Sequence, residues 1–135
     1  MTTVIEYGDL ELSLAAYLRA GLSGWSARVG RLWPDPAATV AGYDVIVRDD
    51  GGPDAQFHAD RLVGVTVLGP EGEHYETGRV AARAASLLRA APEFPSVPVV
   101  RCTTIRGPYA IDSGGRRPAF YLTADLRVVG TPISL

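Results

Sequence analysis

The chain has 135 residues, of which 47% are hydrophobic, enough for a single domain over residues 1–135 with one buried core. Its net charge of −2 lacks the basic excess of a nucleic-acid-binding protein and gives no electrostatic reason to bind an anionic membrane. The lone cysteine, Cys102, excludes an intramolecular disulfide and a thiolate metal cluster. The N-terminus has no signal-peptide pattern and no apolar run approaches membrane-helix length, so we expect synthesis in the cytoplasm without membrane insertion.

The first predicted element is a helix over residues 9–22. Its apolar side chains recur at three- and four-residue steps and so share one stripe: Leu10, Leu14, Tyr17, Leu18 and Leu22. Asp9 is suited to cap the first turn, and Gly21 and Gly24 end the helix.

Three short strands are predicted next, over residues 27–33, 43–48 and 61–68. A loop over 34–43 separates the first two, and the glycine-rich turn 49–54 follows the second. The aspartates of this region lack the ligand spacing of a calcium loop, and we expect them to be solvated: Asp44, Asp49, Asp50 and Asp54.

A second helix is predicted over residues 74–91, closed by Pro92 and Pro95. Its apolar residues share a face, and its many alanines let it pack close to a sheet: Val80, Ala84, Leu87, Leu88 and Ala91.

The last two strands are predicted over residues 97–111, with a bend at Gly107 and Pro108, and over 119–129, joined by the loop 112–118. From residue 120 onward every second residue is apolar, which buries one face of the strand and exposes the other. The apolar set is Phe120, Leu122, Ala124, Leu126 and Val128, and the polar set is Tyr121, Thr123, Asp125 and Arg127.

The elements therefore run α-β-β-β-α-β-β, which predicts an α+β fold: a mainly antiparallel β-sheet covered on one face by two helices. The core is expected where Phe120, Leu122, Leu126 and Val128 pack under Leu14, Leu18, Leu87 and Leu88. The other face of the sheet is mixed in character, and it meets either water or another subunit.

Catalytic chemistry finds little support in the sequence. His58 and His74 have only fragments of a metal site beside them, and no serine sits in a nucleophile motif. The chain has no lysine for a phosphate-binding loop, and Cys102 is expected to act as a small buried hydrophobe. We therefore expect a structural or interaction protein without catalytic residues, cofactor or metal, and not an enzyme.

The element order, and above all the stretch "RGPYAIDSGGRRPAFYLTADLRVVGT" at residues 106–131, resembles the tail terminator proteins of long-tailed phages of actinobacteria. The segments "GRVAARAASLLRAAPEF" and "RVGRLWPDP" also fit that pattern. The resemblance implies a ring, usually a hexamer, that ends the tail tube, stops its polymerisation and offers a surface to the head connector. It implies assembly in the host cytoplasm, a final place in the virion tail, no cofactor and no direct nucleic-acid recognition.

Candidate contacts to a neighbouring subunit or to the tube protein lie in the last quarter of the chain: Arg106, Asp112, Arg116, Arg117, Tyr121 and Arg127. Arg116 and Arg117 are predicted at the tip of the last hairpin, where a planar guanidinium can bind a carboxylate bidentately. The alternative is that both are simply solvated and keep the sheet edge soluble.

Two other kinds of function stay open. One is another phage neck or head–tail joining protein of similar size. The other is a small α+β binding domain or enzyme, for which we would expect a deep pocket with several ionisable groups.

Overall fold

The computed structural model describes residues 2–34 and 41–135. Its elements run in the order β1 (Thr3–Glu6), α1 (Leu10–Gly21), η1 (Ser23–Trp25), β2 (Arg28–Gly30), β3 (Asp44–Asp49), β4 (His58–Leu68), α2 (His74–Ala90), η2 (Ala91–Glu93), β5 (Val99–Ile111), β6 (Ala119–Val129) and β7 (Thr131–Ser134), where η marks a single 3-10 turn. Most of the expected loop 34–43 lies outside the described residues.

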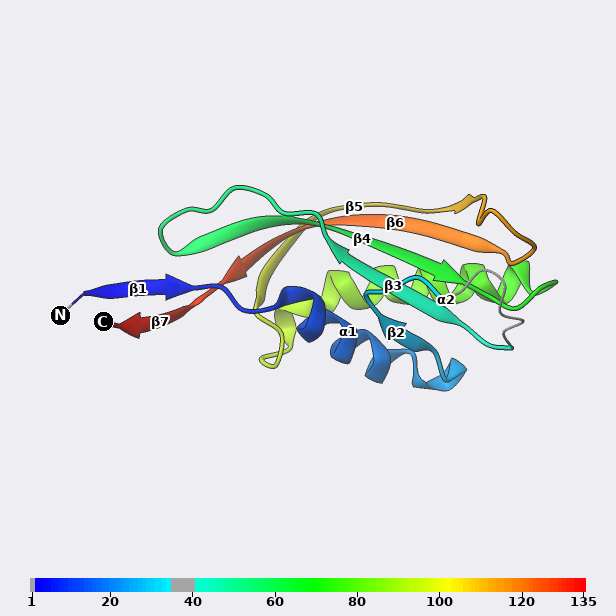
Figure 1. Ribbon diagram of the computed structural model, residues 1–135, viewed down its shortest axis with the longest axis horizontal. Helices are drawn as coiled ribbons and strands as arrows, with labels where there is room; N and C mark the ends of the chain where they lie inside the picture. The colour runs from blue at the N-terminus through cyan, green and yellow to red at the C-terminus, as the bar shows by residue number, and fades with distance from the viewer. Residues whose placement is uncertain (1, 35–40) are drawn as a thin grey trace.

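Five strands form the main sheet, in the spatial order β2-β3-β4-β6-β5, while β1 and β7 pair with each other in a separate two-stranded ribbon (Figure 1). The centre of the sheet is the long antiparallel pair of β4 and β6, whose register runs from His58 opposite Val129 to Leu68 opposite Ala119. Only β2 and β3 pair in parallel among the described strands.

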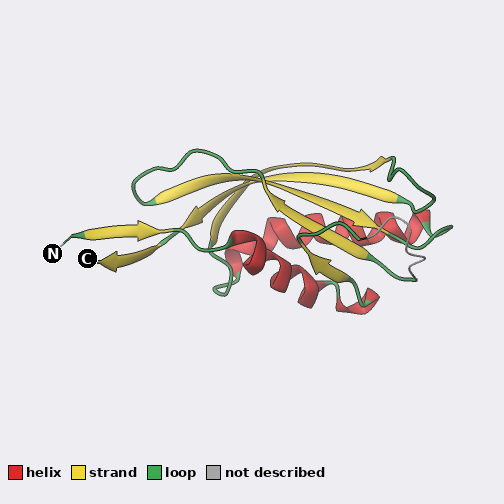
Figure 2. Cartoon of the chain, viewed as in Figure 1, coloured by secondary structure: helices red, strands yellow, loops and turns green. Residues whose placement is uncertain are grey.

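Both helices lie on the same face of the main sheet, which confirms the predicted α+β architecture (Figure 2). The expected core is also confirmed, because Leu14, Leu18, Leu88, Leu122 and Leu126 are at most 1% exposed. At its edge, the predicted members Phe120 and Leu87 are only partly buried.

Local signals place the helices as the sequence predicts. The Asp9 carboxylate accepts a hydrogen bond from the Leu12 amide at 3.1 Å and so caps α1. On α2 the buried face includes Ala81, Ala84 and Ala85, whose small side chains let the helix lie close to the sheet.

The structure departs from the predicted elements at three places. The strand β4 begins at His58 instead of residue 61, because β6 is long enough to pair with the extra residues. The strand β2 spans three residues instead of the seven expected. The strands β1 and β7 were not predicted, because each has four residues and becomes a strand only by pairing with the other end of the chain.

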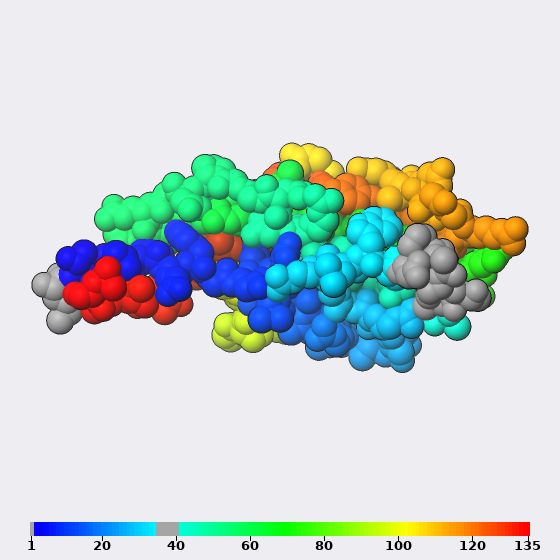
Figure 3. Space-filling view, in the orientation of Figure 1, coloured from blue at the N-terminus to red at the C-terminus, as the bar shows by residue number. Residues whose placement is uncertain are grey.

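The molecule is elongated, and the ribbon of β1 and β7 extends from one end with both chain termini (Figure 3). The β5–β6 loop lies at the opposite end. Neither helix in the described part of the chain has the length and apolar character needed to cross a membrane.

Candidate partner-binding surface

The face of the main sheet that points away from the helices, here called the outer face, carries half of the residues singled out in the sequence. Side chains alternate between the two faces of a strand, and residues opposite each other in the register share a face. Because Leu122 points into the core, Tyr121 and Arg127 of β6 point outward. The register sets Arg106 of β5 opposite Thr123, so Arg106 lies on the outer face as well.

Two ion pairs lie on the part of the outer face that β4, β5 and β6 form. Arg106 Nη1 is 3.0 Å from Asp125 Oδ2, and Arg127 Nε is 3.0 Å from Asp60 Oδ1. The hydrogen bond from Arg127 lowers the pKa of the Asp60 carboxyl against a smaller opposing effect of burial. All four side chains are at least 36% exposed, and such pairs contribute only about 0–1 kcal/mol to folding. These groups can therefore exchange their present partners for those of a bound protein with little loss of stability.

Tyr109 and Tyr121 form an aromatic pair beside these charges, with ring centroids 5.9 Å apart in an edge-to-face arrangement. Tyr121 lies across β4 at Gly64, where an added Cβ would stand 2.6 Å from the Tyr121 hydroxyl oxygen. Tyr109 is 50% exposed. Tyrosine offers a large apolar area with one polar end, and it is enriched in protein interfaces.

The β5–β6 loop at residues 112–118 is shaped by its own side chains. Asp112 Oδ1 accepts a hydrogen bond from the Gly114 amide at 2.8 Å, and the Ser113 hydroxyl donates to the Arg117 carbonyl at 2.8 Å. Asp112 therefore holds the turn. The Arg116 side chain is 86% exposed, and it reaches Glu71 only at 4.0 Å, so Arg116 is at the loop surface as predicted.

Arg117 departs from the expectation of two free arginines at the tip. Its side chain is only 17% exposed, and Nη1 lies 2.9 Å from Asp44 Oδ2. The same guanidinium donates hydrogen bonds to the carbonyls of Gly69 at 2.9 Å and Gly42 at 3.1 Å. Arg117 thus folds back from the loop and fastens it to the end of the sheet.

Asp44 corrects a second expectation, because it is 8% exposed in β3 and does not sit in a solvated turn. Arg28 binds it bidentately, with Nε 2.8 Å from Oδ1 and Nη2 2.9 Å from Oδ2. Burial opposes ionisation of this carboxyl, but the hydrogen bonds from Arg28 and Arg117 outweigh it and lower the pKa of Asp44.

A small apolar cluster on the outer face adjoins Arg117: Ile46, Leu68 and Ala119 are buried and Ile111 packs against them. The side chains of the outer face are consequently buried near the loop, whereas those around the tyrosines and the two ion pairs reach solvent.

The remaining candidate groups are dispersed. His58 begins β4, and the ring of His74 at the start of α2 lies 5.0 Å from that of Phe120. Cys102 is half-buried in β5, and burial raises the pKa of its thiol. Within residues 2–34 and 41–135, no three His, Cys, Asp or Glu side chains are grouped so that they could hold a metal ion.

Sequence reasoning missed Asp60 and Tyr109 as members of this surface. Asp60 fell outside the expected strand 61–68, although it continues the alternation of β4 outward from Ala59. Tyr109 follows a register irregularity in β5 after Arg106, and alternation within the strand does not predict its direction across such a bulge.

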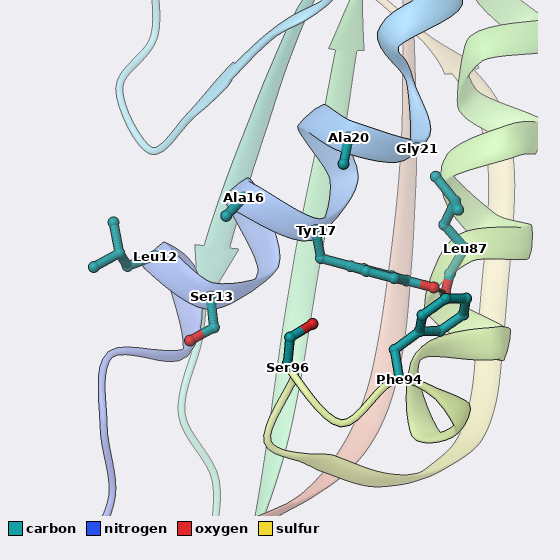
Figure 4. A pocket seen from close by; sticks show the side chains of 9 residues that line it. All are labelled: Leu12, Ser13, Ala16, Tyr17, Ala20, Gly21, Leu87, Phe94 and Ser96. Carbon is teal, nitrogen blue, oxygen red and sulfur yellow. Dashed lines mark hydrogen bonds between the residues drawn. The ribbon is translucent and has the colours of Figure 1, made fainter.

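A separate groove of 690 Å³ lies on the helix side of the molecule (Figure 4). It is lined by Leu12, Ser13, Ala16, Tyr17, Ala20, Gly21, Leu87, Phe94 and Ser96. The Tyr17 hydroxyl donates a hydrogen bond to the Leu87 carbonyl at 2.6 Å, and its ring centroid lies 5.3 Å from that of Phe94. Tyr17 therefore ties α1 to the end of α2 along the groove.

No protein-family model matches the chain, and no curated protein matches it either.

Proposed function

We propose that this chain is a tail terminator protein of a long-tailed bacteriophage, which forms a ring at the head-proximal end of the tail tube. The proposal starts from the resemblance of residues 106–131 and of the element order to that family. The function is binding, without catalysis or cofactor: the ring stops tube polymerisation and presents a surface to the head connector.

The observation that carries the proposal is the outer face, a sheet surface that the helices leave uncovered. It combines the tyrosines 109 and 121 with two exposed ion pairs, Arg106–Asp125 and Arg127–Asp60. Aromatic residues and arginine are the types that contribute most to protein–protein binding. Because Arg106 and Arg127 are each paired with an aspartate, these four groups together add no net charge that would repel a copy of the chain or a neutral partner.

The residues of the outer face have distinct proposed roles. Tyr109 and Tyr121 supply the apolar centre of the contact, while Arg106 and Arg127 provide planar donors at its border. Arg116 projects from the neighbouring loop and extends the contact, and Asp112 keeps the loop in shape. Arg117 acts indirectly, by holding the loop against Asp44.

The test is complementation of tail assembly in a phage that lacks this gene, with tail length measured by electron microscopy. Wild-type protein should give tails of uniform length joined to heads. Tyr109→Ser, which removes an exposed ring from the outer face, should give overlong tails. Tyr75→Ser is the matched control, because Tyr75 is 78% exposed on α2 and away from the outer face.

Three results would contradict the proposal in different ways. Tails of normal length in the absence of the protein would exclude a terminator. Tails of normal length that lack heads would assign the chain to head–tail joining. Normal tails with folded Tyr109→Ser protein would exclude the outer face as the binding surface.

A further inference from the structure

The ribbon of β1 and β7 is an isolated structure within this chain. Its strands pair over four residues, with Thr3 opposite Ser134 and Val4 opposite Ile133. Among the described helices and strands, these two pack on each other and on almost no other element, and Leu135 at their end is 76% exposed. A lone two-stranded ribbon is only marginally stable in water, so an ordered ribbon requires a further surface to pack against.

The groove on the helix side matches the ribbon in chemistry. None of the described residues that line it is charged, and Ala16 and Ala20 leave room along the exposed side of α1. An adjoining hollow of 580 Å³ shares Ser13, Phe94 and Ser96 with the groove, and its described lining residues are also uncharged. In the ribbon, Glu6 is the only charged side chain of β1 and β7. Apart from Glu6, both surfaces consist of apolar groups and hydroxyls, whereas the outer face is rich in charge.

The ribbon does not reach the groove of its own chain in this structure. At its base an added Cβ on Gly130 would stand 2.6 Å from the Glu6 carbonyl oxygen, so β1 lies directly against the point where β6 passes into β7. From there the ribbon runs away from the helices (Figure 1). A second copy of the chain can supply the groove, since every copy carries both surfaces.

We propose that the ribbon of one subunit packs into the groove of the next, with Val4, Ile133 and Leu135 against Ala16, Ala20 and Phe94. Because ribbon and groove are different surfaces, the contact can repeat head-to-tail from one subunit to the next, and it forms a ring where the rotation between subunits closes. The inference deepens the proposed function and rests on it only for the ring, since the contact itself does not depend on a tail.

The first test is the molar mass of the purified full-length chain in solution, measured by light scattering after size exclusion. The wild type should form a closed oligomer. Ile133→Asp in the ribbon and Ala16→Arg in the groove should each raise the dissociation constant about tenfold or more. Both residues lie outside the core, so thermal unfolding monitored by circular dichroism should be nearly unchanged. Leu32→Asp is the matched control, because Leu32 is 82% exposed and belongs to neither surface.

The second test identifies the contact directly. One protein carries Ile133→Cys and another Ala16→Cys, both with Cys102→Ser, and the mixture is treated with a short bismaleimide. A product that joins one chain of each kind supports the proposal, since the link is necessarily between subunits. Products that join only two Ile133→Cys chains would show that ribbons pair with each other, and would overturn it.

The outcomes separate this inference from the proposed function. A wild-type chain that stays monomeric, or an oligomer that tolerates both Ile133→Asp and Ala16→Arg, overturns the ribbon–groove contact. If both changes dissociate the oligomer while tails form normally without the protein, the contact stands and the terminator function fails.

Discussion

The guanidinium of Arg117 has five N–H donors, and the folded chain surrounds it with the Asp44 carboxylate and three backbone carbonyls. Its neighbour Arg116 has only the distant Glu71. Two adjacent residues of the same type therefore have opposite roles, one structural and one available to a partner.

We expect Arg117→Ser to lower the free energy of unfolding by about 1–3 kcal/mol, because it leaves buried acceptors without donors. Arg116→Ser should stay within about 0.5 kcal/mol of the wild type, as is usual for exposed residues. Urea denaturation of the two variants measures the difference. Equal midpoints would show that the loop does not depend on the Arg117 contacts.

Asp44 gives a prediction for acid stability. Its pKa is lower in the folded chain than the unfolded value of about 3.9. The stabilisation is therefore complete above that unfolded pKa and is lost as the pH falls through the folded pKa. The stability advantage of the wild type over Asp44→Asn should shrink as the pH falls below about 4, measured by urea denaturation between pH 7 and 3. A difference independent of pH would contradict the ionised pair with Arg28 and Arg117.

Among the elements, β6 is the strand on which both sides of the sheet depend. Its alternate residues reach the core through Leu122 and Leu126 and the outer face through Tyr121 and Arg127. A one-residue shift of its register would exchange the two sets of side chains. The long pairing with β4 fixes the core and the candidate binding surface together.

We expect Leu126→Ala to lower the free energy of unfolding by about 2–5 kcal/mol, because it opens a cavity in the core. Leu62→Ala is the matched control: Leu62 lies on the outer face of the adjacent strand, opposite Asp125, and is 37% exposed. That control should cost less than about 1 kcal/mol. A denaturation midpoint unaffected by Leu126→Ala would mean that the core face has been misassigned.

The whole molecule combines a well-packed body with a weakly attached ribbon. Local stability follows packing, so amide hydrogens of β1 and β7 should exchange rapidly in the monomer, while those of β4 and β6 exchange slowly. In the oligomer the ribbon amides should become protected. Hydrogen exchange with mass spectrometry on the wild type and on monomeric Ala16→Arg compares the two states. Ribbon protection that is equal in both would contradict packing between subunits.

The sequence by itself determined the two helices, the alternating strand β6 and most of the core. These features depend on local periodicity, on caps such as Asp9 and on turn residues, all of which lie within a few residues of the elements they define. The same periodicity placed Tyr121 and Arg127 on one face before any tertiary contact was known.

Only the tertiary structure decided the role of Arg117, the burial of Asp44 and the existence of the ribbon. Arg117 and Asp44 are 73 positions apart in the chain, by subtraction of their residue numbers, and the ribbon joins the two termini. The energy of such contacts comes from groups that approach only when the chain folds, so no local pattern contains it. An arginine in a glycine-rich loop and an aspartate near a turn are both typical of solvated surface. Arg117 and Asp44 become part of the interior only because folding brings them together.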